Sequence, residues 1–307
     1  MIIYTELSSL ERDLGIQAKT LYAVSNNLSK HYRKVRLPKK SGGYRNLSIP
    51  DKLLKTIQKR IADVLLIHMP VSKYAKAYRF GCSTLRNAKN HVNKPVVLKL
   101  DILHFFDSIR YTTVKDLVFP KQIYAEPIRI LLTMLCYYKD ALPQGAPSSP
   151  VITNIILYEF DEQVGQWCKD RKITYTRYCD DMTFSGDFAP ADVIAFIRKT
   201  LRNRNFLLNE QKIHIQYAGQ QQVVTGIVVN EKLSIPADYR RKLRQELYYC
   251  RKFGIENHLQ QIQSSIPEDI YRRQLLGKIN YVLQVHPKDS NLLSAKKWLI
   301  YRNKEKG

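Results

Sequence analysis

The sequence lacks the features of secreted, membrane-spanning and disulfide-rich proteins. Five cysteines are scattered along 307 residues, and no two of them form a Cys-x-x-Cys pair. This spacing excludes the usual zinc motifs and is typical of a protein kept in a reducing compartment. The first thirty residues carry acidic and polar side chains where a signal peptide has an apolar run. No stretch approaches the roughly 18 apolar residues of a membrane span. These absences predict a soluble, cytoplasmic protein without a membrane partner.

Negative charge is also scarce. Asp and Glu number 27 against 50 Lys and Arg, which gives a formal net charge of +23. The excess is spread along the whole chain and not confined to a tail, so it predicts a basic surface that faces a polyanion. Nucleic acid is favoured over a membrane surface because no long basic amphipathic helix stands apart from the fold. Repeats and low-complexity segments are absent, and the length allows about two domain-sized units.

Two of the few acidic residues are adjacent, in Tyr178-Cys179-Asp180-Asp181. The flanking stretches 173–177 and 182–185 alternate and are rich in β-branched and aromatic residues, which predicts a β-hairpin with both carboxylates at its tip. Two carboxylates so close repel each other, and a divalent cation that prefers oxygen ligands relieves the repulsion. For an Asp pair taken alone, however, a solvated turn is the commoner interpretation.

A third carboxylate makes a metal site the favoured interpretation over a solvated turn. The apolar stretch 96–100 predicts a strand, and Asp101 ends it. An Asp at a strand end, together with an Asp pair on a hairpin, is the ligand set of a two-metal phosphoryl-transfer site. The sequence therefore predicts that Asp101, Asp180 and Asp181 lie together around divalent metal.

Further motifs give the chain a family resemblance. Asp101 with Phe106 five residues later, the Leu-Pro-Gln-Gly-Ala-Pro-Ser-Ser-Pro run at 142–150, and the Tyr-x-Asp-Asp box resemble successive motifs of a reverse transcriptase. Asn-Ala-Lys-Asn-His at 87–91 and Val-Thr-Gly at 224–226 resemble two elements of bacterial retron reverse transcriptases. The similarity runs from about residue 35 to about 287, in the family's order and spacing. Cys179 stands where the family usually carries Ala.

The resemblance implies an α+β fold, a right-hand polymerase with fingers, an antiparallel-sheet palm and a helical thumb. We assign 1–34 to a helical extension, 35–95 to the fingers, 96–230 to the palm and 231–307 to the thumb, with 119–142 as a helical insertion. Periodicity predicts one or two short helices within 1–34, helices at 52–68, 123–138 and 192–203, a short one at 87–91, and three basic helices after 237. It predicts a strand at 223–229. Ser148 or Ser149 is expected to cap a helix that has Pro150 in its first turn.

The family's chemistry implies RNA-directed DNA synthesis from deoxynucleoside triphosphates with two Mg²⁺ ions. Asp101, Asp180, Asp181 and the Ile102 carbonyl would be the ligands, and Lys212 would protonate the leaving pyrophosphate. A merely solvated lysine is the alternative for Lys212. Phe106 would act as a steric gate against a 2′-hydroxyl, with its neighbour Phe105 in the core.

Other binding residues also follow from the resemblance. The fingers hairpin, turning at Gly42-Gly43, would hold the triphosphate through Arg45 and one of Lys39 or Lys40; an ordinary basic hairpin is the alternative. Gln144 and Gly145 would line the nucleotide and template pocket. The His and Asn at 87–91 form either a structural pair or an RNA contact. Thumb arginines would contact duplex phosphates, namely Arg240, Arg241, Arg244 and Arg251.

Retron enzymes copy their own structured non-coding RNA (msr-msd) from a guanosine 2′-hydroxyl. They make msDNA, a branched RNA–DNA hybrid, and many act in antiphage defence with an effector protein. The resemblance implies the same partners here. One rival is another bacterial reverse transcriptase, of the group II intron or abortive-infection type, against which the two retron elements argue. The other is an RNA-binding scaffold without polymerase chemistry, against which the intact three aspartates argue.

Overall fold

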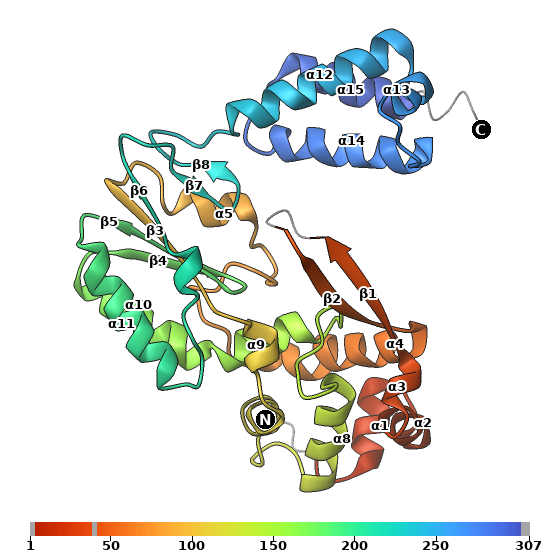
Figure 1. Cartoon of the computed structure of the whole chain (residues 1–307). Coiled ribbons are helices and arrows are strands. Elements are labelled where there is room, and N and C mark those ends of the chain that lie inside the picture. Colours follow the sequence, from red (N-terminus) through yellow and green to blue (C-terminus); the bar gives the residue numbers. More distant parts are fainter. Residues whose placement is uncertain (1–3, 39–41, 302–307) are drawn as a thin grey trace. The chain divides into compact units, whose positions relative to one another are not determined.

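The computed structural model describes residues 4–38 and 42–301, so the predicted triphosphate-binding Lys39 and Lys40 lie outside the described residues. The chain divides into two compact units (Figure 1). The first comprises 1–82 with 98–215, and the second comprises 83–97 with 216–307. These boundaries differ from the predicted fingers, palm and thumb, which remain a prediction. Within the described residues, no helix is long and apolar enough to cross a membrane.

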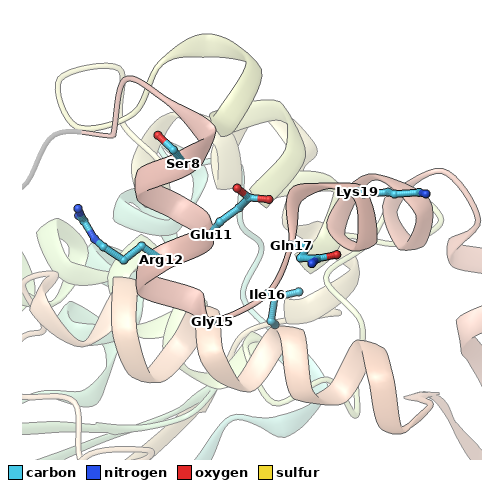
Figure 2. A pocket seen from close by; sticks show the side chains of 7 residues that line it. All are labelled: Ser8, Glu11, Arg12, Gly15, Ile16, Gln17 and Lys19. Carbon is cyan, nitrogen blue, oxygen red and sulfur yellow. The ribbon is translucent and has the colours of Figure 1, made fainter.

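The first unit begins with three short helices, α1 (Leu7–Leu14), α2 (Ala18–Ser25) and α3 (Leu28–His31). One or two short helices were predicted within 1–34; the structure has three there, and strand β1 already begins at Tyr32. α1 ends at Gly15, whose φ of 64° is the left-handed conformation that glycine adopts freely. An open groove of about 560 Å³ lies beside α1 and α2 (Figure 2), where the Glu11 carboxylate accepts the Ala18 backbone N–H. None of the predicted catalytic residues lines it.

The predicted fingers hairpin is present. β1 (Tyr32–Pro38) pairs antiparallel with β2 (Tyr44–Pro50), and the turn glycines Gly42 and Gly43 have φ of 87° and 75°. The following helix α4 (Lys52–Arg60) starts at Asp51, whose carboxylate accepts the Leu54 N–H at 2.9 Å. A π-helical turn (61–65) and a 3₁₀ turn (66–68) continue it, which confirms a helical segment over 52–68.

The central sheet has the strand order β4-β5-β3-β6. Its strands are β3 (Val96–Asp101), β4 (Thr174–Tyr178), β5 (Asp181–Gly186) and β6 (His214–Tyr217). β3 and β5 are buried along most of their length, because helices cover the sheet and remove its apolar side chains from water. α10 packs against β4, and its neighbours in space are α9 and α11. The helices of this region are α6 (Phe105–Ser108), α7 (Tyr111–Thr113), α8 (Glu126–Cys136), α9 (Ser149–Ile156), α10 (Tyr158–Asp170) and α11 (Pro190–Arg202).

The predicted serine cap of α9 is wrong. Ser148 occupies the N-cap position but already has helical backbone angles, φ −75° and ψ −30°, and its side chain makes no capping bond. A capping side chain needs an extended backbone to reach back to the free N–H groups. The Ser149 hydroxyl instead donates to the Pro143 carbonyl at 2.8 Å, which ties the helix start to the preceding loop. Pro150 does lie in the first turn, as predicted.

The second unit joins a small hairpin, one short helix and a helical bundle. The predicted helix near 87–91 is α5 (Thr84–Lys89). The predicted strand 223–229 is wrong: β7 (Val223–Val224) and β8 (Ile227–Val228) form a tight hairpin. Thr225 and Gly226 between them have φ of 46° and 83°, and two successive positive φ angles reverse the chain.

The bundle contains four helices among the described residues where three were predicted. They are α12 (Ala237–Phe253), α13 (Ile255–Gln261), α14 (Glu268–Leu283) and α15 (Ser290–Tyr301). Gly254, with φ 87°, ends α12 and lets the short α13 fold back beside it. Buried residues of α12, α13, α14 and α15 form the core of this unit together with residues of α5 and of the small hairpin.

Candidate active site

The β4–β5 hairpin presents the predicted carboxylate pair. Tyr178 is paired with Asp181, so Cys179 and Asp180 form a two-residue loop. Cys179 has a φ of 62°, which is uncommon for a residue other than glycine, asparagine or aspartate. Asp180 therefore lies in the turn and Asp181 opens β5. The hairpin predicted from the alternating pattern is confirmed.

Backbone hydrogen bonds bring Asp101 to this turn. Asp101 is the last residue of β3, and the next N–H, that of Ile102, donates to the Asp180 carbonyl at 3.3 Å. On the other side, Asn209 donates twice to Asp101, from its backbone N–H to the carbonyl (2.8 Å) and from its side-chain amide to the carboxylate (3.0 Å). Asn209 was not among the predicted site residues, because no motif or periodic pattern in the sequence includes it.

Lys212 completes the cluster. Its Nζ lies 2.9 and 3.0 Å from the two carboxylate oxygens of Asp101. Asp101, Asp181 and Lys212 line one open pocket of about 310 Å³, together with Lys99 and His214. The structure thus brings together all four residues predicted to be catalytic, which come from three separate parts of the chain.

The surroundings of the cluster shift the pKa values of its ionisable side chains. Loss of water, followed by the negative charges of Asp180 and Asp101, raises the pKa of Asp181 to about 6, although its side chain reaches the surface. Burial and then the Asp101 charge raise the pKa of Asp180. Burial alone would lower the pKa of Lys212, but its hydrogen bonds with Asp101 and the Asp101 charge raise it. Burial raises the pKa of the Cys179 thiol to about 12, so this side chain stays neutral.

The donor set fits a hard divalent cation. Three carboxylates supply the oxygen ligands that Mg²⁺ prefers. Burial, and then neighbouring negative charges, disfavour the charged forms of Asp180 and Asp181, which a bound cation would favour. Within residues 4–38 and 42–301, no three acidic, imidazole or thiol side chains are yet arranged around a common metal position. The Lys212 ammonium group contacts both carboxylate oxygens of Asp101.

A buried ion pair is hydrogen-bonded to the backbone of the turn. Arg177 and Asp161 are both fully buried, and the Arg177 guanidinium donates to the Asp161 carboxylate at 2.6, 2.9 and 3.1 Å. The Tyr175 hydroxyl donates to the same carboxylate at 2.7 Å. The remaining Arg177 nitrogen, Nη1, donates to the Cys179 carbonyl at 2.8 Å. A buried charge thus fixes the residue that precedes Asp180, and no sequence pattern indicated it.

Comparison with known proteins shows the family of this chain. The profile of the family described as reverse transcriptase (RNA-dependent DNA polymerase) matches residues 37–244. The retron Ec83 reverse transcriptase of Escherichia coli is 31% identical over 245 residues, covering 74% of this chain and 78% of the relative. This chain belongs to the retron reverse transcriptases. It therefore has the right-hand polymerase fold of RNA-directed DNA polymerases, with mixed helices and an antiparallel sheet.

Two further comparisons give the share of each chain that is similar. The retron Mx65 reverse transcriptase of Myxococcus xanthus is 31% identical over 289 residues, and the alignment covers 87% of this chain but only 64% of that relative. A solved foamy viral protease-reverse transcriptase in complex with double-stranded DNA covers 86% of this chain and 40% of its own, at 13% identity and a TM-score of 0.46.

In this reverse transcriptase, the predicted steric gate lies on the short helix after Asp101. Phe105 is 2% exposed and belongs to the core, as predicted, whereas Phe106 is only partly buried against it. The two rings meet edge to face, with centroids 5.5 Å apart. The Phe106 carbonyl accepts the Leu142 N–H at 3.1 Å, so Phe106 is tied to the start of the Pro-Gln-Gly loop.

That loop packs against the fingers strand β2. The Gln144 carbonyl accepts the Ser48 N–H at 2.9 Å. Gly145 has a φ of 119°, and a Cβ there would lie 2.9 Å from the Ser48 carbonyl oxygen. Glycine is therefore needed for both the conformation and the close approach. Arg45, the other predicted nucleotide contact, lies on the same strand with an exposed side chain.

The two retron elements meet in the second unit. The Thr225 hydroxyl of the Val-Thr-Gly turn donates to the Thr84 carbonyl at the start of α5, at 2.8 Å. From α14, the Tyr281 hydroxyl donates to the Gly226 carbonyl at 2.8 Å. Asn87 and His91 are fully buried, which favours the structural alternative for this pair over an RNA contact.

Proposed function

We propose that this chain synthesises DNA on its own structured non-coding RNA and produces a branched msDNA. The observation that carries the proposal is the meeting of Asp101, Asp180, Asp181 and Lys212 at one end of the sheet. Three carboxylates beside a protonated amine are the groups that transfer of a nucleotide to a hydroxyl requires. Membership of the retron family supports a structured RNA as the template and msDNA as the product.

Each residue has a defined task in nucleotide addition. Asp101, Asp180, Asp181 and the Ile102 carbonyl would hold two Mg²⁺ ions, which when bound lower the pKa of the attacking hydroxyl and stabilise the charge on the leaving pyrophosphate. Lys212, whose raised pKa keeps it protonated at neutral pH, would give a proton to that pyrophosphate.

Substrate selection is assigned to residues around this cluster. Phe106 would lie beneath the sugar of the incoming deoxynucleoside triphosphate and exclude a 2′-hydroxyl. Gln144 and Gly145 would line the pocket for the nucleotide and the template. Arg45 on β2 would contact the triphosphate together with Lys39 or Lys40.

The biological setting follows from the retron relatives. We propose priming from a guanosine 2′-hydroxyl of the cognate msr-msd RNA, a cytoplasmic location, and a role in antiphage defence with an effector protein. The net charge of +23 supports lasting association with RNA and its DNA product.

Sequencing the nucleic acid that co-purifies with the protein tests this proposal. The expected result is one RNA species joined to DNA through a 2′–5′ bond, which a debranching enzyme separates into two strands. Purification of the Asp180→Asn, Asp181→Asn variant is the matched control and should yield the RNA without DNA. Linear cDNA from many cellular RNAs would instead indicate another type of reverse transcriptase.

A further inference from the structure

The second unit contains a groove that the polymerase chemistry does not use. It lies between α12 and α15 and has a volume of about 410 Å³, within the range of small-molecule sites. Its apolar lining consists of Leu247, Leu292 and Ala295, which are only 5%, 5% and 2% exposed. An apolar wall of this kind accepts a flat, poorly hydrated group.

The rim of the groove is cationic and aromatic. Tyr248 is 56% exposed, and the Lys252 Nζ lies 5.6 Å from the centre of its ring. Arg251 is held in place, with its guanidinium 5.8 Å from the centre of the Trp298 ring and bonded to the Ser294 hydroxyl at 3.2 Å. Arg244 adds a third cation along the same side of α12.

No acidic side chain is among the described residues that line this groove. Glu246, the carboxylate nearest in sequence on α12, is engaged elsewhere, by the Lys278 ammonium at 2.7 Å and the Tyr271 hydroxyl at 2.6 Å. The groove therefore attracts anions. Asn291 contributes a carboxamide, which has both donor and acceptor groups for the edge of a base.

We propose that this groove binds one unpaired nucleotide of a bound nucleic acid. Its base would stack on Tyr248 over the apolar wall, its edge would meet Asn291, and its flanking phosphates would lie against Arg244, Arg251 and Lys252. Duplex presents only phosphates and would leave the aromatic and apolar surface unused. An acidic peptide would use the cations but not the flat aromatic face. Stacking platforms combined with cations are the usual means of binding unpaired bases.

This inference rests on the proposed function, because it gives the second unit a way to distinguish loops from stems in the template RNA. It adds a site outside the active-site cluster, at which Arg244 and Arg251 of the predicted phosphate-binding arginines flank a place for an unpaired base. Unpaired RNA and unpaired DNA share the chemistry that the groove recognises, so the experiment includes probes of both kinds.

Fluorescence anisotropy with four labelled probes tests the inference. The probes are a hairpin with an unpaired loop and a blunt duplex of the same length, each as RNA and as DNA. Tyr248→Ala should weaken binding of the loop probe by about 5- to 150-fold, the range that stacking of one base supplies, and change duplex binding less than about twofold. Tyr248→Phe keeps the ring and should retain loop binding.

A charge control separates stacking from attraction. Lys252→Gln should weaken both loop and duplex binding, whereas Lys242→Gln, an exposed lysine of α12 outside the groove, should change loop binding less. A preference of the wild type for the RNA loop over the DNA loop assigns the site to the template, and the reverse preference assigns it to the product strand.

Equal losses on loop and duplex, or unchanged loop binding by Tyr248→Ala, would overturn the proposal. Selective competition by an acidic peptide would also overturn it in favour of a protein partner. Primer extension by the wild-type protein is measured alongside. Failure of the wild type to extend a primer would count against the proposed function. Normal extension by the wild type, together with unchanged loop binding by Tyr248→Ala, would count against the groove alone.

Discussion

Replacing Arg177 should separate the stability of the palm from the positioning of its catalytic turn. Arg177→Met leaves the Asp161 carboxylate charged, fully buried and without its cation. Removal of one partner of a buried ion pair typically costs about 3–5 kcal/mol. For a cooperative unit of this size each kcal/mol lowers Tm by roughly 2–4 °C, so the expected loss is about 6–20 °C. The exposed pair Arg198–Glu210 supplies the matched control, since Arg198→Met should cost at most about 1 kcal/mol.

The double variant Asp161→Leu, Arg177→Met makes the prediction sharper. Replacing both charges with apolar groups removes the unpaired carboxylate, so much of the lost Tm should return. Activity should not return with it, because the Cys179 carbonyl still lacks the Arg177 donor. A hydrogen bond from a charged donor contributes about 1.5–3 kcal/mol, which corresponds to a loss in kcat of up to about 10- to 150-fold.

Thermal unfolding by circular dichroism and single-turnover primer extension measure the two effects. Full recovery of both activity and Tm in the double variant would show that the ion pair serves stability alone and does not position the turn. Unfolding of Arg177→Met at no lower temperature than Arg198→Met would contradict the expected cost of the unpaired carboxylate.

Three further variants test the roles of Phe106, of Gly145 and of the thumb arginines. Phe106→Ala should raise the ratio of ribonucleotide to deoxynucleotide incorporation on one template, and an unchanged ratio would place discrimination elsewhere. Gly145→Ala should lower Tm by more than Gly15→Ala, because a Cβ at 145 meets the Ser48 carbonyl oxygen at 2.9 Å while one at 15 meets nothing within 4 Å; equal effects would show that the loop relaxes. Neutralising the thumb arginines should flatten the log–log salt dependence of RNA binding by about 0.7–0.9 for each phosphate that the protein no longer neutralises. The arginines to be changed are Arg240, Arg241, Arg244 and Arg251. We also expect the ratio of cognate to scrambled RNA affinity to fall, and binding titrations of both RNAs at two salt concentrations measure it; an unchanged ratio would contradict this expectation.

The sequence predicted the active-site cluster because its residues mark the ends of strands. Asp101 follows an apolar run, and Asp180 lies between two alternating segments, so each pattern fixes both the element and the place of the carboxylate. The fingers hairpin was predictable for a similar reason, since Gly42-Gly43 readily adopts the positive φ angles that the connection between its strands uses.

Features that depend on tertiary structure were not predictable in this way. Arg177 reads as a surface residue of β4, and nothing near it in sequence shows that Asp161, on helix α10, neutralises it. The break at Thr225 was missed because apolar residues on both sides make one continuous strand pattern. Helix α13 was missed because seven residues give too little periodicity, and only Gly254 marks its start.

Primer extension on an RNA template with Mg²⁺ and all four deoxynucleotides tests the central claim most directly. The wild-type protein should extend the primer, whereas Asp180→Asn, Asp181→Asn should not, because two of the three carboxylate ligands lose their charge. The variant should still bind the RNA and unfold at or above the wild-type Tm, since the substitutions replace two carboxylates whose charged forms are disfavoured by burial and then by neighbouring negative charges. Extension by the variant at a rate close to that of the wild type would contradict the assignment of this cluster as the active site.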